Sequence, residues 1–388
     1  MKSLKIIMKI VMNWTKKITI IFFILSITFL VISWSLKSFQ LLMLAIVLLM
    51  SSLTIKFEKI RTFMLPIISV GFILTIAEFL IPVLTKDYTQ LVKYDPESGY
   101  ISGGYYQRVP GFGYRLTPGK HTSKKLTASG ETIYDVIYTI GPDGYRKDVD
   151  TNSYDGYIYG GSYAFGEGLN DNQTISYYLY HQYNISTKNM GVHGFGLQQA
   201  LYNIQQGIES HMTNGINILL TAPWHSLRSS CKKSYSNGTP RYILKNGSLQ
   251  LEGVCKYRSH DSILSKVLSK SNVIKLFKHV NNNENVITDN DIDLYLEIIR
   301  EIKKLSKQKN MLLIIAYIDA ANDRLSATKW TNESLIAELE NISDDVIDVS
   351  LTDKRKDLES KFYIHDLDQH PSALANKQRS KILHSVFK

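Results

Sequence analysis

The chain has 388 residues, a formal net charge of +10, ten histidines and two cysteines. The charge is unevenly spread, because residues 1–85 carry nine Lys or Arg against two Glu, whereas the rest is nearly balanced. Nucleic-acid binding would need a basic patch on the folded part of the chain. Composition therefore excludes nucleic acid as an expected partner. With so few cysteines and no suitably spaced ligands, we expect neither a metal site nor a cofactor.

Three apolar runs occupy the first 85 residues, at about 18–36, 39–55 and 62–84. Nineteen helical residues extend roughly 28 Å, which is close to the thickness of a bilayer core. Pro66, Gly71 and Glu78 interrupt the third run, as transmembrane helices tolerate when neighbouring helices cover the backbone. A cleaved signal peptide is the alternative for the first run, but two more runs follow it. The sequence therefore predicts an anchor of three transmembrane helices.

Basic residues flank these runs unevenly. Five lysines and no acid precede the first run, and the 56–61 loop carries two lysines and an arginine. The positive-inside rule places both in the cytoplasm and everything after about residue 86 outside, as expected for a bacterial inner-membrane protein. Glu78 in the third run is a functional candidate because acids are rare within membrane spans, but we favour the interpretation that it reaches the interface or pairs between helices.

Both cysteines, Cys231 and Cys255, lie in the part predicted to be extracytoplasmic. An oxidising compartment would allow a disulfide closing about 25 residues, worth on the order of 3 kcal/mol. Two unpaired thiols are the alternative.

The sequence after about residue 86 divides into two regions that differ in composition and in their expected secondary structure. Residues 86–150 are rich in Tyr, Gly and Thr, contain the strand-like 132–140 and a turn at 141–144, and form a small β-rich lead-in. Residues 151–388 alternate short apolar strands with helices, which indicates an α/β sandwich around a mostly parallel sheet. Residues 226–290 interrupt this alternation as an insertion. The expected strands are 157–159, 188–190, 216–221, 312–317 and 346–349, and the expected helices are 175–183, 197–211, 291–307 and 373–387.

Three loops carry candidate chemistry. The first strand ends in Gly160-Gly161-Ser162, a tight turn that can lift a serine hydroxyl above the sheet edge. Residues 189–196 (NMGVHGFG) follow the second strand and open a helix. Residues 366–371 (DLDQHP) place a histidine beside carboxylates before the last helix, which suits a general base with its orienter. Each loop alone could be a plain connection.

Together these loops resemble the SGNH/GDSL hydrolases over about residues 155–388. Residues 160–168 match the nucleophile motif, Asn189-x-Gly191-x-x-Gly194 the glycine block, and Asp368-x-His370-Pro371 the final motif. The resemblance implies a three-layer flavodoxin-like sandwich and hydrolysis or transfer of an acyl ester. It implies Ser162 as nucleophile, His370 as base and Asp368 as orienter. It also implies oxyanion donation by the N–H groups of Ser162 and Gly194.

Three departures from the family pattern stand out. Gly161 replaces the motif Asp, and the Asp lies two rather than three residues before the His, which makes Asp366 a fallback orienter. After strand 216–221 the family's Asn oxyanion donor is missing. His225 or Arg228 could replace it, or could be structural. Arg228 and Asn189 are also candidate substrate-binding residues.

Location and resemblance together lead to an expected function. We expect a membrane-anchored extracytoplasmic serine esterase or acyltransferase that acts on an acylated carbohydrate of the cell envelope or on another ester. Because three spans are few for an acyltransferase, a separate acyl-donor partner in the membrane is conceivable. The alternative is an inactive glycan-binding or assembly protein, which the lost motif residues would suit.

Overall fold

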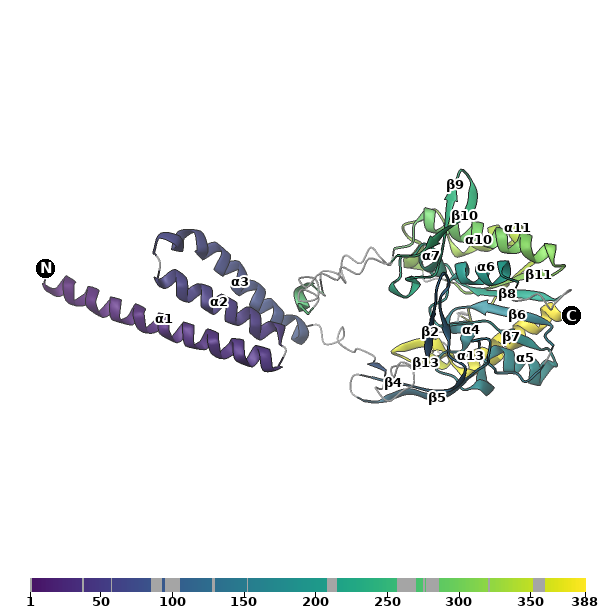
Figure 1. Ribbon diagram of the computed structural model, residues 1–388, viewed down its shortest axis with the longest axis horizontal. Helices are drawn as coiled ribbons and strands as arrows, with labels where there is room; N and C mark the ends of the chain where they lie inside the picture. Colours follow the sequence, from purple (N-terminus) through teal and green to yellow (C-terminus); the bar gives the residue numbers. More distant parts are fainter. Residues whose placement is uncertain are drawn as a thin grey trace. The chain divides into compact units, whose positions relative to one another are not determined.

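The computed structural model describes residues 2–36, 38–56, 58–84, 93–94, 105–127, 130–151, 153–207, 215–256, 270–274, 276, 286–319, 322–351 and 360–388 (Figure 1). The chain forms two compact units. The first comprises residues 1–90 and 259–282, and the second comprises residues 91–258 and 283–388. Thus part of the predicted insertion joins the N-terminal unit, and the predicted β-rich lead-in joins the unit that holds the α/β sandwich.

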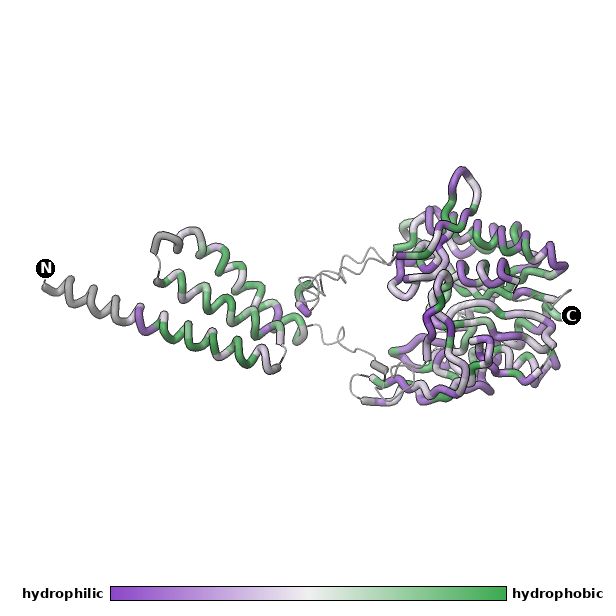
Figure 2. Tube along the Cα trace, in the orientation of Figure 1, coloured by the Kyte–Doolittle hydropathy of each residue, from purple (hydrophilic) through white to green (hydrophobic). Residues whose placement is uncertain are grey.

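Three apolar helices make up the described part of residues 1–85: α1 (Lys2–Leu36), α2 (Phe39–Lys56) and α3 (Glu58–Leu84). Figure 2 shows the hydrophobic colour along all three. Within α1 and α3, the segments 14–35 and 64–81 are long and apolar enough to cross a membrane, whereas the apolar stretch of α2, Phe39–Ile55, is shorter. Many large apolar side chains on α1 and α3 are exposed, including Trp34, Val31 and Ile73. These helices are compatible with membrane anchoring.

Glu78 on α3 is buried and fully engaged within the first unit. Its carboxylate accepts hydrogen bonds from the Ser271 hydroxyl and from the backbone N–H groups of Asn272 (2.7 Å) and Val273 (3.3 Å). The Asn272 side chain also donates to the Glu78 carbonyl at 3.0 Å. The acid therefore holds a piece of the predicted insertion against the third apolar helix, by pairing within the protein.

A five-stranded parallel sheet forms the centre of the second unit. Its strands are β6 (Gly156–Gly160), β7 (Thr187–Asn189), β8 (Ile216–Thr221), β11 (Leu312–Tyr317) and β12 (Asp345–Asp348). They lie in the order β12-β11-β8-β6-β7, and each neighbouring pair is parallel. In chain order this is 2-1-3-4-5, the flavodoxin-like arrangement. The predicted fold class is confirmed.

Helices cover both faces of this sheet (Figure 1). One face carries α6 (Leu197–Gln205), α10 (Asp289–Gln308) and α11 (Asn332–Ile342), and the other carries α5 (Ile175–Tyr183) and α13 (Ala373–Leu383). Strand residues alternate between the two cores, as the two-residue period of a strand requires. In β8, Leu219 joins the first core, whereas Ile218 and Leu220 join the second. The result is a three-layer sandwich.

The remaining strands pair antiparallel outside the central sheet. The lead-in holds β1 (Lys93–Tyr94), β2 (Tyr106–Val109), β3 (Gly113–Leu116), β4 (Gly119–Leu126) and β5 (Thr132–Ile140). The later pairs are β9 (Pro240–Lys245) with β10 (Ser248–Val254), and β13 (Tyr363–His365) with β14 (Asp368–Pro371). Buried lead-in aromatics such as Tyr105 and Tyr138 share the core of α6 and α10. For this reason the lead-in packs as part of the same unit.

Most predicted elements agree with the structure. Strands 216–221 and 312–317 and helix 175–183 have the predicted bounds, while the strand predicted at 188–190 lies at Thr187–Asn189. Helix α6 ends at Gln205 rather than at residue 211, and residues 208–214 lie outside the described residues. The predicted closing helix becomes a 3₁₀ turn after Leu383. The predicted insertion holds the β9–β10 hairpin.

Candidate active site

Ser162, His370 and Asp368 form a connected chain of hydrogen bonds. His370 Nε2 lies 2.9 Å from Ser162 Oγ, and His370 Nδ1 lies 2.5 Å from Asp368 Oδ1. Ser162 and Asp368 are buried, and the His370 side chain is 22% exposed. His370 therefore lies between a buried carboxylate and a serine hydroxyl, and it is more exposed to solvent than either partner. This arrangement suits proton transfer from Ser162 to His370.

Ser162 owes its position to the sheet topology. It follows β6, whose neighbours β7 and β8 come next along the chain on opposite sides, so it lies at the point where the strand order reverses. In open α/β sheets such points at the carboxyl ends of the strands form binding crevices. Ser162 also starts α4 (Ser162–Phe165), a single turn ended by Gly166 in the left-handed conformation. The sharp turn holds the hydroxyl at the sheet edge.

The two-residue spacing of the acid and the base follows from β14. Asp368 and His370 are two positions apart on a strand, so their side chains point to the same face. The carboxylate thereby reaches Nδ1 of the imidazole directly. Asp366, the fallback orienter, lies before the strand and is exposed. The structure therefore pairs His370 with Asp368 rather than with Asp366.

Lys125 on β4 completes the surroundings of Asp368. Its Nζ lies 2.7 Å from Asp368 Oδ2, and its side chain is 14% exposed. Each oxygen of Asp368 thus has one positive or protonated partner, His370 on Oδ1 and Lys125 on Oδ2. Since Lys125 comes from the lead-in, this region contributes directly to the site.

A second carboxylate, Glu167, also approaches the base. Its Oε2 lies 3.3 Å from His370 Nε2 and 2.7 Å from Nδ1 of the buried His193. The other ring nitrogen of His193 lies 2.8 Å from the Tyr105 hydroxyl. His370 Nε2, the nitrogen that faces Ser162, therefore has two oxygen neighbours.

The loop that carries Glu167 is held by two glycine turns and by hydrogen bonds from Arg146. Gly166 and Gly168 on either side have φ of 81° and 77°, so the chain turns sharply at both. The buried Arg146 guanidinium donates to the carbonyls of Phe165 (2.9 Å), Gly166 (2.9 Å) and Leu169 (2.5 Å). The position of Glu167 beside His370 is therefore fixed by the backbone.

Neighbouring charges set the protonation of these groups. Burial lowers the pKa of His370, but the charge of Glu167 and the hydrogen bond to Asp368 raise it more, so the net pKa is raised. Burial raises the pKa of Asp368, but His370 and Lys125 outweigh it and lower the net value. For Glu167, burial is likewise outweighed by the charge of His370 and by the hydrogen bond from His193, which hold its pKa far below the usual range. Both carboxyls are therefore ionised at neutral pH.

Gly194 lies in a loop that runs along the nucleophile turn. The Val192 N–H donates to the Gly160 carbonyl at 3.3 Å, and the Phe195 carbonyl lies 3.2 Å from where a Cβ on Gly161 would be. Gly194 itself has φ of 73°, and a Cβ there would come within 2.8 Å of the Tyr114 hydroxyl. The positive φ and the close Tyr114 hydroxyl therefore favour glycine at this position, and its loop is adjacent to the Ser162 turn.

The loop after β8 carries His225 and Arg228 on the short helix α7 (His225–Ser229). His225 is buried with Nδ1 3.1 Å from the Thr221 hydroxyl, and burial together with the charge of Arg228 lowers its pKa well below the usual value. Among the described residues, no hydrogen bond or ion pair joins His225 to Ser162 or His370. These contacts favour a structural role for His225 over oxyanion donation.

Arg228 explains the glycine in place of the motif Asp. Its guanidinium donates to the Phe195 carbonyl at 2.7 Å, and Nη1 lies 2.3 Å from where a Cβ on Gly161 would be. A side chain at residue 161 would therefore displace the guanidinium. The loop after β8 thus places a cation beside the residue that precedes Ser162.

Asn189 is internal. Its side chain donates to Asp148 at 2.8 Å and accepts from the Gly191 N–H at 3.0 Å, and only 1% of its surface is exposed. A residue so placed does not reach a substrate. The predicted substrate contact of Asn189 is therefore replaced by a structural role in shaping the glycine block.

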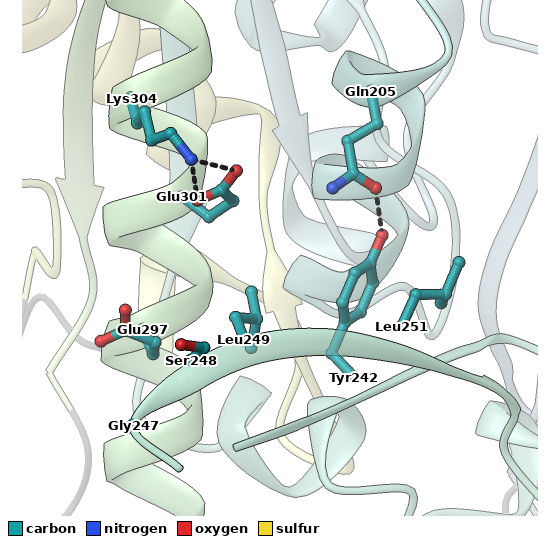
Figure 3. A pocket seen from close by; sticks show the side chains of 9 residues that line it. All are labelled: Gln205, Tyr242, Gly247, Ser248, Leu249, Leu251, Glu297, Glu301 and Lys304. Carbon is teal, nitrogen blue, oxygen red and sulfur yellow. Dashed lines mark hydrogen bonds and ion pairs between the residues drawn. The ribbon is translucent and has the colours of Figure 1, made fainter. Parts of the chain in front are cut away.

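Two further features lie among the described residues. Cys231 and Cys255 form a disulfide, as predicted, with Cα atoms 5.3 Å apart. A hollow of about 330 Å³ lies between the β9–β10 hairpin and helices α6 and α10 (Figure 3). Its polar contacts are internal, Tyr242 to Gln205 and Lys304 to Glu301, and it contains no residue of the Ser162 cluster. Within the described residues, no group of three or more His, Cys, Asp or Glu could hold a metal ion.

Sequence reasoning missed Lys125, Glu167, His193 and Tyr105. A signal existed for Glu167, because a residue between two glycines five positions after the nucleophile lies in the same turn. His193 lies in the glycine block and had no separate signal. Lys125 and Tyr105 lie in the lead-in, where nothing local indicates contact with a residue far along the chain.

No protein-family model matches the sequence, and no curated protein matches it. Several solved structures are similar to this chain, including the following two. One is described as a putative lipolytic protein of the G-D-S-L family from Desulfitobacterium hafniense DCB-2, at 14% identity and a TM-score of 0.31, covering 60% of this chain and 99% of the other. The second is a member of the lipolytic G-D-S-L family from Veillonella parvula DSM 2008, at 14% identity and a TM-score of 0.36, covering 61% and 98%.

Proposed function

We propose that this chain is a membrane-anchored serine esterase or acyltransferase of the SGNH/GDSL type, with Ser162 as nucleophile, His370 as base and Asp368 as orienter. The observation that carries the proposal is the unbroken contact from Ser162 Oγ through both nitrogens of His370 to Asp368. A serine hydroxyl is a weak nucleophile unless a base takes its proton. The same contact favours an enzyme over an inactive binding protein.

The reaction follows the two-step course of acyl transfer. As Ser162 Oγ bonds to the carbonyl carbon of the ester, its proton passes to His370 Nε2 and the carbonyl π electrons move to the oxygen. When the tetrahedral intermediate collapses, the C–O bond to the leaving alcohol breaks and the His370 proton goes to that oxygen. Water or an acceptor hydroxyl then gives its proton to His370 Nε2 and attacks the acyl-serine carbonyl carbon, forming a second tetrahedral intermediate. When this intermediate collapses, the bond between the acyl carbon and Ser162 Oγ breaks, and the proton on His370 returns to Oγ and restores the serine hydroxyl.

Negative charge on the carbonyl oxygen needs donors beside Ser162. We assign this role to the N–H groups of Ser162 and Gly194, which lie in adjacent segments of the chain. Removing one such donor typically costs about 3–4 kcal/mol of barrier. The guanidinium of Arg228 lies against Gly161 and adds positive charge on this side, in place of the family's missing Asn.

The proposed extracytoplasmic location limits the classes of substrate that the enzyme would meet. Apolar helices α1 and α3, basic residues before the first run and a disulfide in the second unit together support a catalytic unit outside the cytoplasmic membrane. An esterase there would meet acylated glycans of the cell envelope. We propose these as the substrate class, with a membrane acyl donor as partner if the reaction is a transfer.

A serine-directed fluorophosphonate probe tests this function on the full-length protein in detergent. We expect the wild type to be labelled and to hydrolyse short-chain aryl esters, and Ser162→Ala and His370→Ala each to lose both activities. The exposed Ser153 provides a matched control, so Ser153→Ala should be labelled like the wild type. Full activity in folded Ser162→Ala protein would refute the assignment.

A further inference from the structure

Nε2 of His370 is contacted by two oxygens, Ser162 Oγ at 2.9 Å and Glu167 Oε2 at 3.3 Å. A single nitrogen carries at most one proton. When Nε2 is unprotonated, it accepts a hydrogen bond from the Ser162 hydroxyl. It then has no proton to donate to the Glu167 carboxylate. When Nε2 is protonated, the N–H is attracted to the carboxylate, and Ser162 loses its acceptor. The two oxygens therefore favour opposite protonation states of the base.

His193 keeps Glu167 in its ionised form, and a negative charge at Glu167 favours the protonated state of His370. Burial lowers the pKa of His193 despite the opposing charge of Glu167, so this ring is neutral. A neutral imidazole has one donor nitrogen and one acceptor nitrogen. With Nδ1–H donating to Glu167 at 2.7 Å, Nε2 accepts from the Tyr105 hydroxyl at 2.8 Å. Glu167 is thus ionised and oriented, while His193 does not neutralise its charge.

We propose that Glu167 is a second carboxylate partner of the base, which stabilises the imidazolium that forms on His370 as Ser162 attacks. This inference rests on the proposed function. Asp368 stabilises the imidazolium from the Nδ1 side and fixes its orientation, whereas Glu167 acts from the Nε2 side. The ring is therefore held between two negative charges at the moment when it is positive.

The same contact sets the pH range of the enzyme. An opposite charge at this distance favours the charged form of His370 before the substrate arrives as well as after. Resting enzyme with a protonated base is inactive, so Glu167 moves the acidic limb of the rate profile to higher pH. Glu167 therefore raises the rate of ester hydrolysis at pH values above the acidic limb, but it also widens the low-pH range in which the enzyme is inactive.

Other charged groups near His370 act in known directions. Asp368 raises the pKa of His370, and Lys125 lowers it. Tyr163 on α4 stacks edge-on against the ring with centroids 5.6 Å apart, and burial keeps its hydroxyl neutral by raising its pKa. These groups are unchanged when only residue 167 is altered. A shift seen in a Glu167 variant is therefore attributable to Glu167.

The test compares Glu167→Gln with wild type in full-length detergent-solubilised protein. Gln has nearly the same shape but no charge. In kcat/KM measured against pH with an aryl ester, we expect the acidic limb to move to lower pH and the plateau to fall. Asp135→Asn removes one exposed carboxylate from β5, outside the site, and should leave the profile unchanged. An unmoved limb in folded Glu167→Gln protein would overturn the inference.

A second measurement does not depend on turnover. Diethyl pyrocarbonate modifies only unprotonated imidazoles, so the pH dependence of its reaction with the His370 peptide, followed by mass spectrometry, reports the pKa of this residue. We expect a lower pKa in Glu167→Gln and a smaller decrease in Glu167→Asp, which keeps the charge but withdraws it by one methylene. Identical modification–pH curves in the wild type and both variants would contradict the inference. If the wild type shows neither ester hydrolysis nor probe labelling but the curves of the variants are still shifted, the proposed function is refuted. The electrostatic effect of Glu167 on the pKa of His370 would then remain supported.

Discussion

Replacing Asp368 by Asn tests the orientation of His370 with a very small change in shape. Oδ1 accepts from His370 Nδ1, and Oδ2 accepts from Lys125 Nζ. An amide keeps one acceptor oxygen, but its nitrogen only donates. In Asp368→Asn one of these two neighbours must therefore face a donor in place of an acceptor.

The size of the effect depends on which neighbour faces the amide nitrogen. If it is His370, the ring proton moves to Nε2, which then cannot accept from Ser162. Such a loss lowers kcat about 10⁴-fold in a serine-protease triad, or ~5.5 kcal/mol at about 1.4 kcal/mol per tenfold. If it is Lys125, the ion pair between Lys125 and Asp368 is lost, which for a buried pair costs about 3–5 kcal/mol in folding free energy. With Lys125 14% exposed, the lower end applies.

Two measurements separate these outcomes, kcat/KM for an aryl ester and the midpoint of denaturant unfolding. We expect Asp368→Asn to lose activity on the order of 10⁴-fold with little change in stability, or to lose stability if the amide turns towards Lys125. Asp366→Asn should match the wild type, because Asp366 is exposed. Near-normal activity and stability in Asp368→Asn would refute the reasoning, and inactivity in Asp366→Asn would identify that residue as the orienter.

Three further outcomes are expected. The double variant Ser162→Ala/His370→Ala should lose hardly more ester hydrolysis than either single variant, because the residues act as a unit; additive losses would assign them separate roles. Replacing Cys231 and Cys255 together by Ser should lower the free energy of unfolding by ~3.5 kcal/mol, since the disulfide joins residues 24 apart. An unchanged denaturation midpoint would contradict that mechanism. Alkaline phosphatase fused after residue 90 should be active and a cytoplasmic reporter there silent; the reverse would overturn the extracytoplasmic location.

The sequence predicts the central strands more completely than it predicts the surroundings of the candidate site. Strands β8 and β11 were predicted with correct bounds, because both are continuous apolar runs that a buried parallel strand requires. Helix α6 was predicted too long, since its amphipathic pattern continues past Gln205 where the observed helix ends. Local pattern therefore identifies an element better than it locates its end.

The sequence by itself determined the apolar N-terminal helices and the parallel α/β fold, and it supplied Ser162, His370 and Asp368 as the candidate site residues. These features depend on hydropathy, on strand and helix periodicity and on short motifs, all of which are local along the chain. Only the tertiary structure decided between Asp368 and Asp366, and only it brought Lys125 and Glu167 to the base. Lys125 lies 243 positions before Asp368, and contacts between residues so far apart depend on how separate elements pack. The electrostatics of His370 are set by those contacts and so could not be read from the motif that contains it.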